Sequence, residues 1–156
     1  MDIAKVIKKY FHSFSITTNG SLMYYLAEDL KENGLDNVNF SLDSLNKENF
    51  KSITRRDDLE NVLKGLEKSL EIGLNVKLNT VIQKRNLSEV FDLIEFSAKR
   101  KLPIRFIELM PIGNSYNEDD FISEDALKSK IKEKYNLEPV KTKFGFGLQI
   151  IFLLRI

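Results

Sequence analysis

The sequence contains no cysteine, and its one histidine is His12. Thiolates and imidazoles are the usual ligands of protein-bound zinc, and thiolates hold iron–sulfur clusters. The chain therefore cannot build a zinc, haem or iron–sulfur site from thiols of its own. Any chemistry assigned to it has to rest on hydroxyl, amide, carboxylate and cationic side chains.

Long apolar runs and an excess of one charge are also missing. No apolar stretch approaches the roughly 20 residues of a membrane helix, and the first residues show no signal-peptide pattern. Lysine and arginine (24) nearly balance aspartate and glutamate (23), which leaves no electrostatic footprint for nucleic acid. At 156 residues the chain is long enough for one domain with a real core. We expect a soluble, cytoplasmic protein with no nucleic-acid or membrane partner.

Polar and apolar residues alternate strictly over residues 38–43, with Val38, Phe40 and Leu42 on one side. The same alternation occurs over residues 14–19 and, in part, over residues 76–80. A period of two predicts strands, but parallel strands between helices are normally apolar on both faces. Strands of a barrel resolve the conflict, because their polar side chains can line an interior that holds water or a ligand. We therefore predict one shared polar face.

Between and beyond these strands, apolar residues at helical spacing predict helices, and a fourth strand is predicted at residues 104–109. The helices are expected at residues 2–10, around Leu22, Leu26 and Leu30, from Leu59, after a cap at Asn86 or Ser88, and after a cap at Ser123; residues 46–50 are expected to form a single capped turn. Four successive β–α units predict a parallel, right-handed α/β array. Four strands are too few for a barrel of eight, so the array is a small open sheet or part of a larger barrel.

The last nine residues, 148–156, are almost entirely apolar. They could form a final buried strand, or they could result from a disrupted reading frame. We therefore divide the chain into residues 1–147, which carry the fold, and residues 148–156, a divergent tail.

Several polar residues fall at or near the carboxyl ends of the predicted strands, where α/β folds bind ligands. Asn19–Gly20 could be only a turn, although the glycine would also let a ligand approach the backbone. Ser41 and Asp43 could cap the next element or face a ligand. Lys77, by contrast, lies inside the third predicted strand, and it could extend to the rim, bind an anion or form a Schiff base.

The remaining positions have structural interpretations, and Arg105 has a functional one as well. Arg105 fits an anion clamp, whereas Glu108 on the same strand is expected to be structural. Met110 after that strand is of a type that usually fills cores. Residues 55–58, two arginines followed by two aspartates, are expected to form a solvated cluster that compensates its own charge.

Six ordered blocks, at residues 16–20 (ITTNG), 34–35 (GL), 38–45 (VNFSLDSL), 53–58 (ITRRDD), 73–79 (GLNVKLN) and 105–113 (RFIELMPIG), carry a family resemblance. Over roughly residues 2–147 the chain resembles the GTP 3',8-cyclases, also called molybdenum-cofactor biosynthesis protein A, of the radical S-adenosylmethionine (SAM) superfamily. The complete enzymes of that family perform the first step of molybdenum cofactor biosynthesis. They convert GTP to a cyclic pyranopterin precursor through a 5'-deoxyadenosyl radical.

The resemblance implies a partial (β/α)6 radical-SAM-type barrel, of which this chain carries the third to sixth β–α units. It implies that Ser41, Met110 and Asn19 contact SAM. It also implies that Thr17, Lys77 and Arg105 contact the substrate GTP. A homodimer is compatible with the full-length form.

The chain also departs from this family. The three-cysteine loop and the later cysteine set, which hold [4Fe-4S] clusters in full-length members, are absent, as is a Gly-Gly-Glu segment. Arg55 stands where the family usually has glycine, and residues from 148 onward diverge, which favours a truncated or frame-disrupted end.

The favoured hypothesis is therefore a fragment of a GTP 3',8-cyclase that is inactive on its own. One alternative is a non-catalytic remnant that still binds SAM or a nucleotide. Another is a Schiff-base lyase with Lys77 as nucleophile.

Overall fold

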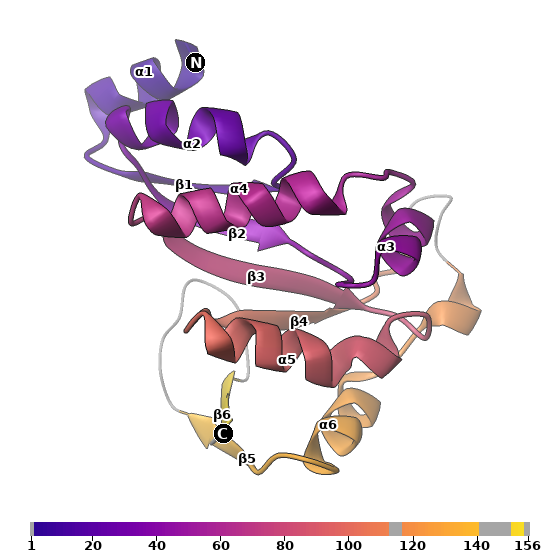
Figure 1. The fold of residues 1–156 in the computed structure, drawn as a ribbon. Coiled ribbons are helices and arrows are strands. Elements are labelled where there is room, and N and C mark those ends of the chain that lie inside the picture. The colour runs from indigo at the N-terminus through magenta and orange to yellow at the C-terminus, as the bar shows by residue number, and fades with distance from the viewer. Residues whose placement is uncertain (1, 113–116, 141–150, 155–156) are drawn as a thin grey trace.

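The computed structural model describes residues 2–112, 117–140 and 151–154 (Figure 1). Its elements, in chain order, are α1 (Asp2–Tyr10), β1 (Phe14–Thr18), α2 (Met23–Glu32), β2 (Leu35–Ser41), α3 (Lys47–Thr54), α4 (Leu59–Glu71), β3 (Asn75–Ile82), the 3₁₀ turn η1 (Leu87–Glu89), α5 (Val90–Lys99), β4 (Ile104–Glu108), the 3₁₀ turn η2 (Glu118–Asp120), α6 (Glu124–Lys132), β5 (Leu137–Val140) and β6 (Ile151–Leu154).

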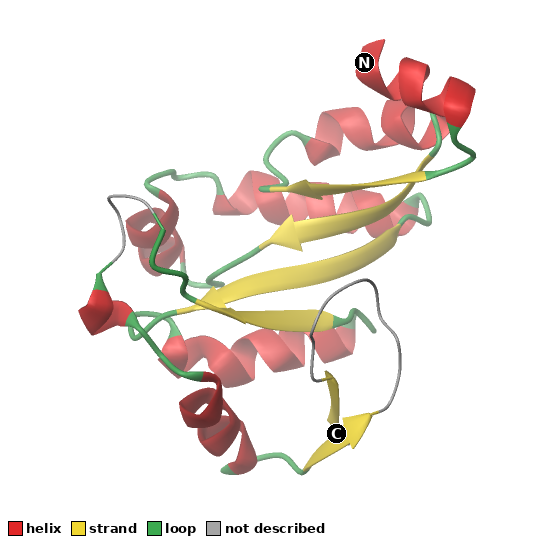
Figure 2. Cartoon of the chain, turned by 180° about the vertical axis from the view of Figure 1, so that it is seen from behind, coloured by secondary structure: helices red, strands yellow, loops and turns green. Residues whose placement is uncertain are grey.

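The centre of the fold is a four-stranded parallel sheet in the order β1-β2-β3-β4. Helices α2, α4 and α5 all lie on one face of this sheet (Figure 1), and a view from behind shows the strands in front of them (Figure 2). The predicted parallel α/β array is therefore confirmed. In the part of the chain that the structure describes, the other face of this open sheet is left uncovered by helices, as expected of part of a barrel.

The covered face carries the apolar half of each alternating strand. Val38, Phe40 and Leu42 have no exposed surface, and Leu78 of β3 and Leu66 of α4 are equally buried. Fully burying a side chain of this size contributes about 1.5–3 kcal/mol. The period of two in the sequence thus decides which face of each strand the helices cover.

Helix α4 packs directly against the turn that follows β1, and two glycines make this possible. Gly65 lies so close that an added Cβ would be 2.6 Å from the carbonyl oxygen of Gly20. Gly20 has a φ of +80°, and a Cβ there would lie 2.5 Å from the ring of Phe40. The turn before α2 therefore sits tightly between β2 and α4.

Two of the predicted side-chain helix caps form in the structure, and the one predicted at Asn86 or Ser88 does not. The side chains of Asn46 and Ser123 accept hydrogen bonds from the backbone N–H of Asn49 and Ala126. Residues after Asn46 form the eight-residue helix α3 and not a single turn. No side-chain cap forms at η1 or α5, because Asn86 is fully buried and bonds to other backbone groups.

Part of the predicted tail forms strand β6, which pairs antiparallel with β5 in a separate two-stranded sheet. The remaining tail residues, 148–150 and 155–156, lie outside the described residues. Among the helices that the structure describes, none is long and apolar enough to cross a membrane.

Candidate functional site

The uncovered face of the sheet carries two rows of polar side chains. In the first row Thr17 of β1 is paired with Asn39 of β2, and Asn39 is paired with Lys77 of β3. Asn39 Nδ2 lies 3.5 Å from Thr17 Oγ1, at the limit of a hydrogen bond. Paired residues of parallel strands point to the same face, so these three side chains stand side by side.

The second row lies two residues further toward the carboxyl ends of the strands. Here Ser41 is paired with Asn79, and Asn79 with Arg105 of β4. Neighbouring strands are about 4.8 Å apart and residues two apart are separated by about 6.6 Å along a strand. Thr17, Ser41 and Lys77 thus share a face within about 10 Å of one another, so the predicted shared polar face is confirmed.

Asn19 and Met110, predicted to contact SAM, follow β1 and β4 at the same end of the sheet. Asn19 Oδ1 already accepts hydrogen bonds from the N–H and the hydroxyl of Ser21, which leaves its amide protons for a ligand. Met110 is 59% exposed, so it does not fill the core. Whether either residue contacts SAM stays a prediction.

Two sequence interpretations are decided by local contacts. The Phe40 ring takes the space that a side chain at Gly20 would need, so packing and the turn account for the glycine, and the approach of a ligand to its backbone stays a prediction. Glu108 is structural as expected, because its Oε1 accepts a hydrogen bond of 2.5 Å from the N–H of Glu124 at the start of α6.

Just beyond Ser41, hydrogen bonds connect residues 42 and 43 to the end of β3 and the turn after it. The Thr80 hydroxyl donates to the carbonyl of Leu42 at 2.7 Å, and Asn86 Nδ2 donates to the carbonyl of Asp43 at 2.8 Å. Asp43 Oδ1 in turn accepts from the N–H of Val81 at 2.8 Å. These bonds hold the carboxyl ends of β2 and β3 together, next to the second polar row.

The carboxyl of Asp43 is half-buried in this region. Burial raises the pKa of Asp43 above its ordinary value, and the hydrogen bond from the Val81 N–H partly offsets the rise. Of the two roles that the sequence leaves open for Asp43, capping of the next element does not fit, because its Oδ1 bonds to β3; contact with a ligand stays a prediction.

A second set of hydrogen bonds holds the segment that links β2 to α3. The carboxylate of Glu89, in η1, accepts hydrogen bonds from the Ser44 hydroxyl, the N–H groups of Leu45 and Asn46, and the Asn49 side chain, at 2.5–3.1 Å. We call this set of hydrogen bonds the Glu89 clamp. It could not be predicted from local sequence, because its partners lie 40 or more residues before Glu89.

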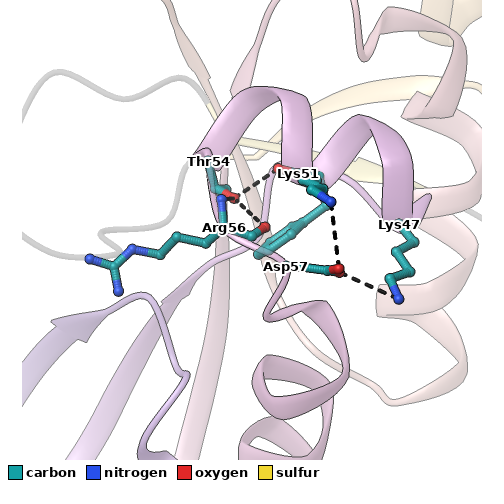
Figure 3. Close-up of polar contacts among 6 residues, drawn as sticks. Lys47, Lys51, Thr54, Arg56 and Asp57 are labelled. Atoms are coloured by element: carbon teal, nitrogen blue, oxygen red, sulfur yellow. Dashed lines mark hydrogen bonds and ion pairs between the residues drawn. The ribbon is translucent and has the colours of Figure 1, made fainter.

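The charged residues between α3 and α4 pair differently from the prediction. Asp57 is engaged by the ammonium groups of Lys47 at 3.4 Å and Lys51 at 3.7 Å (Figure 3). In the part of the chain that the structure describes, neither Arg55 nor Arg56 makes a side-chain ion pair or hydrogen bond. The predicted self-compensated cluster is wrong, because lysines of α3 and not the arginines neutralise the aspartate.

No group of three or more histidine, cysteine, aspartate or glutamate side chains that could hold a metal ion occurs among the described residues. With no cysteine in the sequence, the chain has no thiolates to hold an iron–sulfur cluster. A hollow of about 230 Å³ lies away from the polar face, on the helical layer between Tyr24, Tyr25, Asn61 and Lys64.

A parallel α/β sheet with helices on one face and polar rows on the other has the architecture expected of part of a (β/α) barrel. A sequence model of the radical SAM superfamily matches residues 1–97, and the chain belongs to that superfamily.

Similar curated relatives within the superfamily include several GTP 3',8-cyclases. The chain is 44% identical over 137 residues to the one from Syntrophomonas wolfei, covering 85% of this chain and 42% of the relative. It is 46% identical over 132 residues to one from Clostridium botulinum (82% and 40%) and 41% identical over 130 residues to one from Synechocystis (81% and 40%). The chain thus spans about two fifths of the length of the curated relatives it matches.

Proposed function

We propose that this chain is the central part of a GTP 3',8-cyclase, which acts in molybdenum cofactor biosynthesis and converts GTP to a cyclic pyranopterin precursor. The observation that carries the proposal is the strand register. It sets Thr17, Lys77, Ser41 and Arg105 on the face of the sheet that none of the described helices covers. The relatives named GTP 3',8-cyclase support it.

In this proposal Ser41, Asn19 and Met110 hold SAM. Ser41 offers a hydroxyl at the end of β2, and the turn at Asn19 uses only its Oδ1, so its amide protons can be donated to a ligand. Such neutral groups suit the methionine portion of SAM, whose carboxylate and ammonium need acceptors and donors close together. Exposed Met110 offers an apolar, polarisable surface beside them.

Thr17, Lys77 and Arg105 would hold GTP. The ammonium of Lys77 and the guanidinium of Arg105 suit phosphate oxygens, because charge-assisted hydrogen bonds are about twice as strong as neutral ones. Asn39 lies between Thr17 and Lys77 in the first row, and Asn79 lies between Ser41 and Arg105 in the second. Both supply further amide donors and acceptors. The chain's own role is thus to bind and orient the two ligands against one sheet.

The radical chemistry that SAM supplies in the complete enzymes requires a cluster, and the thiolates for it are not part of this chain. We therefore expect the purified 156-residue chain, reconstituted with iron and sulfide under reductant, to release no 5'-deoxyadenosine. Chromatographic detection of 5'-deoxyadenosine above the level of a protein-free control would contradict this.

A chimera tests the proposal where the chemistry can be completed. The matched segment of the Syntrophomonas wolfei GTP 3',8-cyclase is replaced by residues 2–112 of this chain, and anaerobic conversion of GTP is followed. We expect the chimera to convert GTP. Lys77→Gln should lower the rate of conversion about 100-fold, because it removes a charged contact to the substrate. If the chimera folds but is inactive, while the parent Syntrophomonas wolfei enzyme is active in the same assay, the proposal is refuted.

A binding-only role is the second candidate, because the polar face is present and the cysteines are absent. Calorimetry with SAM and with GTP distinguishes a binding remnant from an inert one. Binding of either ligand to the 156-residue chain, together with an inactive chimera, would favour this candidate.

A further inference from the structure

The loop between α3 and α4 lies at the carboxyl end of the sheet. The chain leaves β2 at Ser41, forms α3, and starts back along the covered face at Leu59, the first residue of α4. Helix α3 lies beyond the ends of β2 and β3 in Figure 1. Arg55 and Arg56 are therefore at the end of the sheet where α/β folds bind their ligands.

The backbone of this loop is fixed by local bonds. Arg55 ends α3 in a left-handed conformation with a φ of +59°, and its N–H donates to the carbonyl of Lys51 at 2.9 Å. The Thr54 hydroxyl lies 2.8 Å from the carbonyl oxygen of Phe50 and 3.2 Å from both the nitrogen and the carbonyl oxygen of Arg56. Phe50 is itself 4% exposed, so Arg56 is tied to the core through one threonine.

The neighbouring carboxylates are occupied by other groups. Asp57 is shared by Lys47 and Lys51, and Asp58 Oδ1 faces the side-chain amide of Asn61 at 3.5 Å. Figure 3 shows the Arg56 side chain extended away from Asp57 and from the body of α3. The guanidinium thus projects from a fixed backbone with no internal partner among the described residues.

From this arrangement we infer that Arg56 is a phosphate-binding residue of the nucleotide site, at the rim beyond Lys77 and Arg105. The inference rests on the proposed function, which puts the nucleotide on the polar face. A guanidinium presents a planar fork of donors that matches two phosphate oxygens, so an arginine suits this position better than a lysine does. The bracing of the loop limits the conformational entropy that Arg56 loses on binding.

The test is calorimetry on the full 156-residue chain with three probes: GTP, guanosine and inorganic tripolyphosphate. Arg56→Gln removes the charge, and Arg56→Lys keeps the charge but loses the fork. Arg100→Gln is the matched control, because this guanidinium follows α5 at the opposite end of the sheet and pairs with Glu67 at 2.6 Å. Circular dichroism establishes that each variant is folded.

We expect Arg56→Gln to weaken GTP and tripolyphosphate binding about tenfold and to leave guanosine binding unchanged. Arg56→Lys should recover part of the loss, and Arg100→Gln should bind all three probes as the parent chain does. Equal GTP affinity in Arg56→Gln and the parent, with guanosine still bound, overturns the inference alone. Failure of the parent chain to bind GTP overturns both the nucleotide face and the role of Arg56.

Discussion

The Glu89 clamp gives a prediction whose magnitude follows from counted contacts. Its carboxylate faces four donor groups, from Ser44, Leu45, Asn46 and Asn49, and Ser44 has no exposed surface. A hydrogen bond to a charged group contributes about 1.5–3 kcal/mol net, and a buried donor left without a partner costs about 1–3 kcal/mol. Because Glu89 is half-buried, water can hydrogen-bond some of the donor groups that the carboxylate leaves behind. We therefore expect Glu89→Ala to lower the free energy of unfolding by about 3 kcal/mol.

Chemical and thermal unfolding measure this directly. For a chain of this size, about 3 kcal/mol corresponds to a Tm lowered by roughly 6–12 °C. Glu89→Gln should lie between the parent and Glu89→Ala, because its amide nitrogen would face N–H donors. The effects of Ser44→Ala and Glu89→Ala should be less than additive, since both remove the same bond.

The control is Glu95→Ala, which removes a carboxylate of the same helical region that pairs with Lys134 at the surface. Its Tm should stay close to that of the parent, because exposed ion pairs contribute little. A Glu89→Ala protein with the Tm of the Glu95→Ala protein would refute the clamp as a source of stability.

Three further substitutions test other contacts. Arg55→Gly should raise the free energy of unfolding by about 0.5 kcal/mol in urea titrations, because the residue adopts a left-handed conformation that glycine accepts without strain. Gly65→Ala should lower the Tm by an amount equivalent to about 2 kcal/mol, since the added Cβ would meet the carbonyl of Gly20. Asp43→Asn should stabilise the fold at neutral pH and keep an acceptor for the Val81 N–H. The gain should shrink as the pH falls toward the ordinary carboxyl pKa, because a raised folded-state pKa costs stability only where the carboxyl is charged.

Each of these has a clear contrary result. An unchanged or lower stability of Arg55→Gly would mean that the arginine side chain contributes more than its backbone costs. Alanine favours helices by about 1 kcal/mol over glycine, so a stabilised Gly65→Ala would show that α4 can move away from the turn. A pH-independent difference between Asp43→Asn and the parent would show that the Asp43 pKa is not raised by burial.

The sheet and its polar face could be predicted because both depend on local alternation. Val38, Phe40 and Leu42 face helices and Asn39, Ser41 and Asp43 do not, and this holds in any register that buries the apolar residues. The register is another matter: Ser41 pairs with Asn79, and Asn79 with Arg105, but the alternation alone does not specify these partners.

What could not be predicted depends on contacts between distant segments. Nothing near Asn86 in the sequence distinguishes a helix cap from a buried amide that bonds to Asp43 and Val81. The partner of Asp57 was predicted wrongly for a related reason, since adjacent opposite charges suggest a local pair. The helical geometry of α3 instead brings Lys47 and Lys51 to the aspartate.

The most direct test of the central claim is a map of amide chemical shifts of the ¹⁵N-labelled chain with GTP and SAM added. The account predicts that the largest changes occur at Thr17, Asn39, Ser41, Lys77 and Arg105, on the face of the sheet away from the helices. Changes confined to the helical layer around Tyr24 and Lys64, or no changes at saturating ligand, would contradict it.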